Sequence, residues 1–123
     1  MEPSSQLEIL MLGNQTALAY LIGRYAQRSG CTVTALRVEP HAAELSARKP
    51  VAILFTSVES LEASQGLIAG MANSDIPVLV CSSVADEARA RELGADHCLL
   101  HPVTYDAFCE ALTVSSLVDK TER

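Results

Sequence analysis

Short apolar segments alternate along the chain with longer segments whose apolar residues recur at helical spacing. The apolar segments are typical of strands covered on both faces, and they span residues 7–12, 31–38, 51–55, 76–81 and 98–100. A helix-like segment follows each of them, at residues 15–29, 40–47, 60–71, 83–94 and 104–115. This alternation predicts an α/β fold with one doubly wound parallel sheet.

Local signals place the helix ends. Gly30 is expected to end the first helix in a left-handed turn. Pro40 fits the first turn of the second helix, and Ser60 is expected to cap the third. Ser83 with Asp86 resembles a capping box for the fourth helix.

Length and composition predict one domain without a nucleic-acid or membrane partner. The 123 residues fit one domain over residues 1–118, followed by a polar tail or linker start at residues 119–123. Apolar residues make up 49% of the chain and aromatic residues only 4%, so the core must consist mainly of aliphatic side chains. The net charge of −6 argues against direct binding to nucleic acid or to an anionic membrane.

The cysteines and the N-terminus favour a cytoplasmic protein. No apolar run is long enough to cross a bilayer, and the first residues do not resemble a signal peptide. The four cysteines form no Cys-x-x-Cys pair, which favours reduced thiols and argues against zinc. Cys81 and Cys98 are expected to face each other across adjacent strands, as buried thiols rather than as a redox pair. His97 and His101 have no further ligand at metal-binding spacing, so no metal site is expected.

Function in such a sheet is expected beyond the carboxyl ends of the strands. The residues there are neutral: Gly13, Asn14, Thr56, Ser82 and His101. No glycine-rich phosphate loop, nucleophile elbow or pair of carboxylates stands at these positions, which argues against an enzyme and predicts no catalytic residue.

Three stretches of the sequence resemble the receiver domain of two-component response regulators. They are Arg28-Ser-Gly-Cys-Thr-Val33, Ile76-Pro-Val-Leu-Val-Cys-Ser-Ser83 and Glu92-Leu-Gly-Ala-Asp-His-Cys-Leu-Leu-His-Pro102. Their order and spacing extend the resemblance over essentially the whole chain. It implies a flavodoxin-like (βα)5 domain with the strand order 2-1-3-4-5.

The resemblance also assigns roles to the neutral positions. Gly13 and Asn14 stand where the family has the acidic residues that bind Mg²⁺, and Thr56 stands at the phospho-acceptor aspartate. Ser82 keeps the family's hydroxyl, and His101 replaces its lysine. Mg²⁺ requires several oxygen ligands, and a threonine cannot form an acyl phosphate. The chain therefore resembles a pseudo-receiver that works without phosphorylation, metal or cofactor.

Two further positions follow from the resemblance. Cys98 replaces the family's aromatic switch residue. Pro102 occupies the position of a proline that is typically preceded by a cis peptide bond.

The leading functional hypothesis is a phosphorylation-independent interaction module. It regulates transcription or another output through a homodimer or a protein partner. By resemblance, the interface comprises the fourth helix, the fifth strand and the fifth helix. Its charged candidates are Arg89, Arg91, Glu92, Asp106 and Glu110, with Asp119 beyond them. The alternative is a sensor that binds a small molecule or an anion in the neutral, hydroxyl-rich crevice.

Overall fold

The computed structural model describes residues 7–72 and 74–112, in which five parallel strands form one sheet. The strands are β1 (Leu7–Leu12), β2 (Cys31–Leu36), β3 (Ala52–Phe55), β4 (Val78–Ser82) and β5 (His97–Leu100). Their order is β2-β1-β3-β4-β5, which confirms the predicted doubly wound, flavodoxin-like sheet. The predicted boundary at residue 118 and the tail lie outside the described residues.

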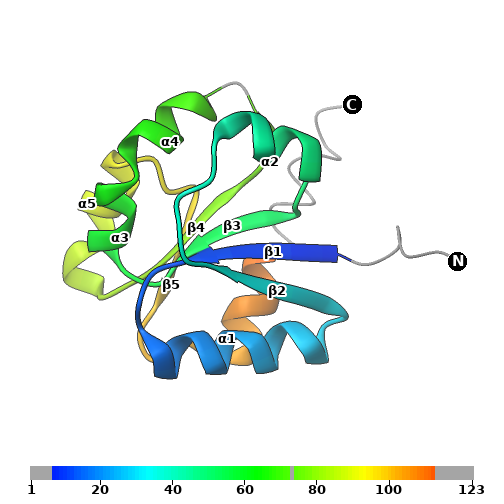
Figure 1. The fold of residues 1–123 in the computed structure, drawn as a ribbon. Coiled ribbons are helices and arrows are strands. Elements are labelled where there is room, and N and C mark those ends of the chain that lie inside the picture. Colours follow the sequence, from blue (N-terminus) through cyan, green and yellow to red (C-terminus); the bar gives the residue numbers. More distant parts are fainter. Residues whose placement is uncertain (1–6, 73, 113–123) are drawn as a thin grey trace, which may run out of the picture.

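Helices connect the strands and cover both faces of the sheet (Figure 1). They are α1 (Thr16–Arg28), α2 (Ala42–Arg48), α3 (Val58–Ala63), α4 (Gln65–Gly70) and α5 (Glu87–Glu92), with a 3₁₀ turn, η2 (Val84–Asp86), before α5. Residues 105–112 are also helical and are called here the C-terminal helical segment. Among the helices of the described residues, none has the length and apolar character needed to cross a bilayer.

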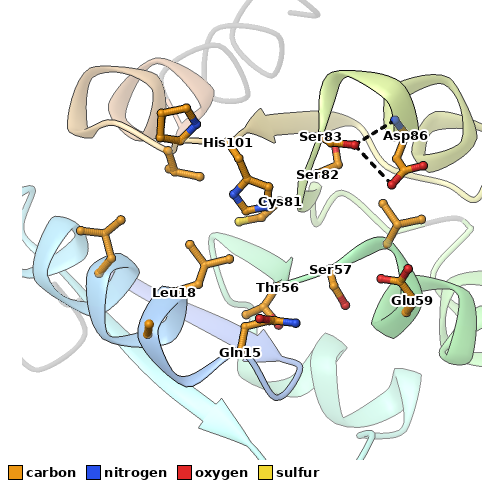
Figure 2. Close-up of a pocket in the computed structure, with 15 residues that line it drawn as sticks. Gln15, Leu18, Thr56, Ser57, Glu59, Cys81, Ser82, Ser83, Asp86 and His101 are labelled. Atoms are coloured by element: carbon orange, nitrogen blue, oxygen red, sulfur yellow. Dashed lines mark hydrogen bonds between the residues drawn. The ribbon is translucent and has the colours of Figure 1, made fainter.

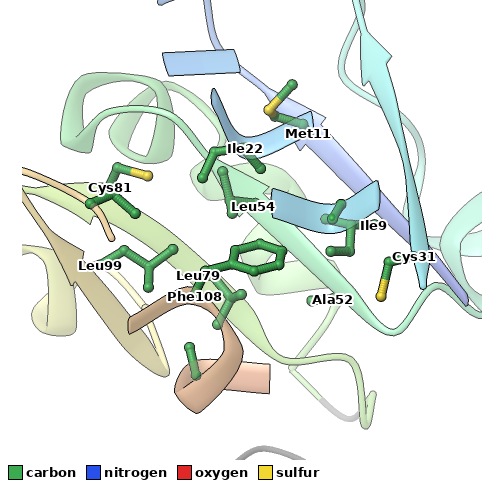
Figure 3. Close-up of a cluster of buried hydrophobic side chains, with 13 residues drawn as sticks. Ile9, Met11, Ile22, Cys31, Ala52, Leu54, Leu79, Cys81, Leu99 and Phe108 are labelled. Atoms are coloured by element: carbon green, nitrogen blue, oxygen red, sulfur yellow. The ribbon is translucent and has the colours of Figure 1, made fainter. Parts of the chain in front are cut away.

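Each face of the sheet has its own apolar core. One core joins Ile9, Leu54 and Leu79 to Ile22 of α1 and Phe108 of the C-terminal helical segment (Figure 3). The other core lies under α2, α3, α4 and α5 and contains Leu10, Phe55, Val80, Leu45, Leu61, Leu67 and Ala90. Successive strand residues alternate between the two cores, as the pleat requires. The strands are therefore buried on both faces.

This alternation corrects one prediction. Cys81 belongs to the core under α1, whereas Cys98 packs against the core on the other face. Cys98 pairs in register with Val80, not with Cys81. Neighbours along a strand point to opposite faces, so Cys81 and Cys98 do not face each other. All four cysteines are free.

The third helix differs from its prediction at its start and in its middle. Ser57, not Ser60, is the cap: its Oγ accepts from the Ser60 backbone N at 3.1 Å. The helix then breaks at Ser64 into α3 and α4. The Gln65 side chain donates both to the Leu61 carbonyl at 3.1 Å and to the Leu93 carbonyl at 2.9 Å, so the break is tied to the end of α5.

The other helix starts were predicted in part. The second helix begins at Ala42 rather than at Pro40, and the His41 backbone N donates to the Glu44 carboxylate at 3.2 Å at its start. Ser83 accepts from the Asp86 backbone N at 3.3 Å, but this cap opens the 3₁₀ turn η2, and no reciprocal capping box forms. Gly30 has the predicted left-handed conformation.

The strand ends also move by one or two residues. The second strand ends at Leu36 rather than at residue 38, and the fourth spans Val78–Ser82 rather than residues 76–81. Val78 begins the fourth strand with its backbone N bonded to the Asp96 carboxylate at 2.7 Å. This long-range contact sets the boundary, and the apolar pattern alone contains no sign of it.

Candidate functional site

The ends of β1 and β3 are closed by direct contact between Gly13 and Thr56. These residues follow paired strands whose last register partners are Leu12 and Phe55. The Thr56 backbone N donates to the Leu12 carbonyl at 2.9 Å. A Cβ atom on Gly13 would lie 1.8 Å from Thr56 Oγ1 and 3.0 Å from Thr56 Cβ, and Gly13 has a φ of 133°. While Thr56 keeps this position, residue 13 accommodates only glycine.

The ends of β4 and β5 instead border an open cavity of about 530 Å³, called here the His101 cavity (Figure 2). It brings together Thr56, Ser82 and His101 of the predicted site. The His101 backbone N donates to the Ser82 carbonyl at 3.0 Å, which holds the two chain segments together. The peptide bond between His101 and Pro102 is cis, as the resemblance implied.

Gly13 and Asn14 line a different cavity, called here the Asn14 cavity. Its volume is about 660 Å³, and Arg37 also borders it. Ser57 and Glu59 line both cavities. The structure therefore divides the predicted site residues between two cavities, because the Gly13–Thr56 contact fills the space at the ends of β1 and β3.

The His101 cavity is not neutral, which corrects the prediction. Glu59 and Asp86 line it, and no lysine or arginine does. Glu59 belongs to α3, and Asp86 lies in the turn before α5. Gln15 also lines the cavity. None of these three residues was among the candidates predicted from the sequence, because only tertiary packing brings them together at this edge of the sheet.

Two hydroxyl groups that line the cavity are buried without a hydrogen-bond partner. Thr56 is 2% exposed and Ser82 is 3% exposed, and neither side-chain oxygen is satisfied. Ser83 caps the turn before α5, so the Ser82 hydroxyl has no capping role there. A buried polar group without a partner costs about 1–3 kcal/mol. Two such groups beside one cavity leave hydrogen-bonding capacity that the described residues do not use.

The two cysteines near the cavity have protonated, unreactive thiols. Cys81 lines the His101 cavity but is only 1% exposed, and burial raises its pKa to about 12. Burial also raises the pKa of Cys98, while the Arg91 guanidinium and the Ser82 hydroxyl lower it in part. A thiol is a weak hydrogen-bonding group, so Cys98 does not satisfy Ser82. Nucleophilic chemistry requires a thiolate, which neither cysteine provides near neutral pH.

No group of three His, Cys, Asp or Glu side chains able to hold a metal ion occurs within the described residues. His97 and His101 therefore do not form part of such a group. Mg²⁺ prefers a near-octahedral oxygen shell, which Asn14 or a single carboxylate does not supply.

The predicted interface residues lie at the surface around α5, β5 and the C-terminal helical segment. All five charged candidates (Arg89, Arg91, Glu92, Asp106 and Glu110) are exposed. Both arginines have partners inside the chain: Arg89 pairs with Glu62 of α3, and Arg91 pairs with Glu87 at 3.4 Å. Of the five candidates, Glu110 borders a cavity of about 240 Å³, which is also lined by His97, Cys98, Leu99, Ala107 and Ala111.

Comparison with known proteins gives similarity of structure only. No family model and no curated protein matches the sequence. A response regulator receiver domain protein from Clostridium thermocellum superposes with a TM-score of 0.70 at 13% identity, covering 95% of this chain and 99% of that one. A CheY-like receiver domain protein from Methanospirillum hungatei superposes with a TM-score of 0.64 at 17% identity, covering 97% and 100%. The fold is that of a receiver domain.

A third structure extends this similarity to a chemotaxis protein. CheY4 from Vibrio cholerae superposes with a TM-score of 0.69 at 13% identity, over 90% of this chain and 99% of that chain. The carboxyl ends of the strands, where the two cavities lie, are the usual functional edge of such a sheet. Thr56, Ser82 and His101 lie at this edge of the sheet.

Proposed function

We propose that this chain is a phosphorylation-independent signalling module of the two-component type. It regulates transcription or another output by forming a homodimer or by binding a partner protein. One observation carries the proposal: Thr56, at the position that the resemblance gives to the phospho-acceptor, packs against Gly13 so closely that residue 13 has no room for a side chain. A metal-binding carboxylate at residue 13 and the present Thr56 exclude each other.

The chemistry of the edge supports the same proposal. Phosphoryl transfer depends on positioned charge: a metal bound by carboxylates and a cation beside the transferred group. At the corresponding positions the chain has Asn14, Thr56 and His101. No lysine or arginine lines the His101 cavity, so no permanently charged side chain there would neutralise a phosphoryl group.

The interaction surface of the proposal comprises α5, β5 and the C-terminal helical segment. β5 is an edge strand of the sheet, and the 240 Å³ cavity adjoins it. The ion pairs of Arg89 and Arg91 are exposed, so they contribute little to folding and can exchange for pairs with a partner. Sedimentation of the chain over a wide range of concentrations tests the homodimer. A monomer at every concentration shifts the proposal to a heterologous partner.

Amide NMR spectra with and without Mg²⁺ plus beryllofluoride test the absence of phosphoryl chemistry. Beryllofluoride is a stable mimic of an acyl phosphate. The expected result is no saturable shift at Gly13, Thr56, Ser82 or His101. Saturable shifts centred on these residues would overturn phosphorylation independence.

A second function, the sensing of a small molecule, is favoured by a separate observation. Two hydroxyl groups without partners, on Thr56 and Ser82, are buried at the His101 cavity. Small-molecule sites are typically concave and largely apolar with a few convergent polar groups, as this cavity is.

A further inference from the structure

We infer that the His101 cavity binds a small organic cation, a primary amine with an apolar body. This assignment rests on the second candidate function, ligand sensing, and it is independent of the interaction module. It replaces the anion expected from the sequence. The lining residues that carry it are Glu59, Asp86, Thr56, Ser82, Leu18 and Leu21.

The charges around the cavity select the sign of the ligand. Glu59 and Asp86 line it from α3 and from the turn before α5, and no lysine or arginine lines it; Arg37 borders only the neighbouring Asn14 cavity, which Glu59 also lines. The whole chain carries a net charge of −6, which adds to the same field. A ligand carboxylate or phosphate would approach two carboxylates without a cation, whereas an ammonium group is attracted.

The hydrogen-bonding groups favour the same head group. An ammonium has three donors and no acceptor, so it requires a lining rich in acceptors. The Ser82 oxygen is buried and unpartnered and can accept, and Thr56 Oγ1 is likewise unpartnered where it lies against Gly13. One Asp86 oxygen accepts only a long bond of 3.3 Å from the Ser83 hydroxyl. Among the described residues, none donates a hydrogen bond to the Glu59 carboxylate.

The rest of the lining selects the body of the ligand. Ala17, Leu18 and Leu21 of α1 form an apolar wall, and Val58, Pro102 and Val103 add further apolar surface. The volume of about 530 Å³ lies within the range of about 300–1,000 Å³ that is usual for small-molecule sites. A short alkyl or similar body therefore packs against α1 while its ammonium faces the carboxylates.

A metal ion fits this lining less well than an amine. Hard divalent cations need several oxygen ligands at short distance. Glu59 and Asp86 do not belong to any group of three metal-ligating side chains within the described residues. An ammonium needs only hydrogen bonds at ordinary length and tolerates their spread around the cavity.

Three probes that share one alkyl chain test the assignment: hexylamine, hexan-1-ol and hexanoate. Each is titrated into the full ¹⁵N-labelled chain at about physiological ionic strength, and the amide spectra are recorded. Hexylamine is expected to give saturable shifts at the residues that line the His101 cavity, and the other two are expected to give none. Glu59→Gln and Asp86→Asn are each expected to weaken hexylamine binding about tenfold, because each removes a charged hydrogen-bond acceptor.

The matched control is Glu39→Gln, which removes an exposed carboxylate outside the cavity and is expected to leave the affinity unchanged. If Glu39→Gln weakens binding as much as Glu59→Gln does, the amine binds the acidic surface and the site is overturned. If hexan-1-ol or hexanoate binds as tightly as hexylamine, the cation assignment is overturned while ligand sensing stands. If none of the three gives saturable shifts, the cation assignment is overturned and this evidence for ligand sensing is lost.

Discussion

The carboxyl ends of β1 and β3 and those of β4 and β5 share one backbone arrangement but differ in what their side chains do. At each edge the residue after one strand donates its backbone N–H to the last carbonyl of its neighbour: Thr56 to Leu12 at 2.9 Å, and His101 to Ser82 at 3.0 Å. At the β1–β3 edge, Gly13 and Thr56 fill the space between them. At the β4–β5 edge, the side chains leave the His101 cavity.

This difference shows how one parallel sheet can be packed closed at one edge and open at another. Backbone hydrogen bonds preserve the edge of the sheet whatever side chains follow the strands. The side chains alone then decide between a packed contact and a cavity. At the β1–β3 edge the space is taken up by packing, while the β4–β5 edge retains room and the unsatisfied Ser82 hydroxyl.

Gly13→Ala gives the sharpest test of the closed edge. The new Cβ would meet Thr56 Oγ1 at 1.8 Å and Thr56 Cβ at 3.0 Å, so rotating the threonine side chain removes only part of the clash. The φ of 133° adds backbone strain. The expected loss in the free energy of unfolding is about 3 kcal/mol, measured by urea denaturation.

Two companion variants separate the clash from other causes. Asn14→Ala changes the neighbouring exposed residue, and its expected effect is within about 0.5 kcal/mol. Thr56→Ala in the Gly13→Ala background removes the clashing oxygen and is expected to recover about 1 kcal/mol, leaving the backbone strain. If Gly13→Ala alone unfolds within about 0.5 kcal/mol of the natural chain, the edge is not closed and the comparison fails.

The sequence was sufficient to predict the strands and the parallel sheet that form the two edges. Continuous apolar runs such as residues 51–55 predicted buried strands, and the alternation with helices predicted a parallel sheet. The order of the strands came from the resemblance, as did the cis bond before Pro102. The left-handed Gly30 followed from local conformational preference. These features depend on local pattern or on motifs that span the chain.

The difference in packing between the β1–β3 and β4–β5 edges could not be predicted from the sequence. Nothing in the residue types shows that Thr56 contacts Gly13, because the contact depends on the register of β1 with β3. Asp86 reaches the cavity through a turn that was expected to be the first turn of a regular helix. The opposite faces of Cys81 and Cys98 likewise depend on a register that no residue type encodes.

Unfolding at alkaline pH tests whether Cys81, which lines the His101 cavity, is shielded from solvent. Burial raises the pKa of the Cys81 thiol from 9.0 to about 12. The folded chain therefore keeps this proton to a higher pH than the unfolded chain does. Stability is expected to be unaffected by this group below pH 9 and to fall between pH 9 and 12, by about 1.4 kcal/mol per pH unit.

Cys81→Ala isolates this effect from the other groups that titrate in the same range. The variant loses stability at pH 8 because it leaves a small void in the core, but it lacks the thiol contribution to the alkaline fall. The difference in unfolding free energy between the two chains is expected to shrink from pH 8 to pH 10. If the difference in unfolding free energy stays constant from pH 8 to pH 10, solvent reaches the Cys81 thiol and the thiol is not buried as described.

Ser82→Ala is expected to change the free energy of unfolding least. It tests most directly whether the β4–β5 edge is a ligand site. The Ser82 hydroxyl is buried and unpartnered, so removing it is expected to raise the free energy of unfolding by about 0.5–1 kcal/mol. Ser57 lines the same cavity but caps α3, and Ser57→Ala is expected to lower stability by about 1 kcal/mol. Urea midpoints at equal m-values measure both variants. If Ser82→Ala instead destabilises the chain, the hydroxyl has a partner in solution and does not await a ligand, and the two edges differ less than their side chains indicate.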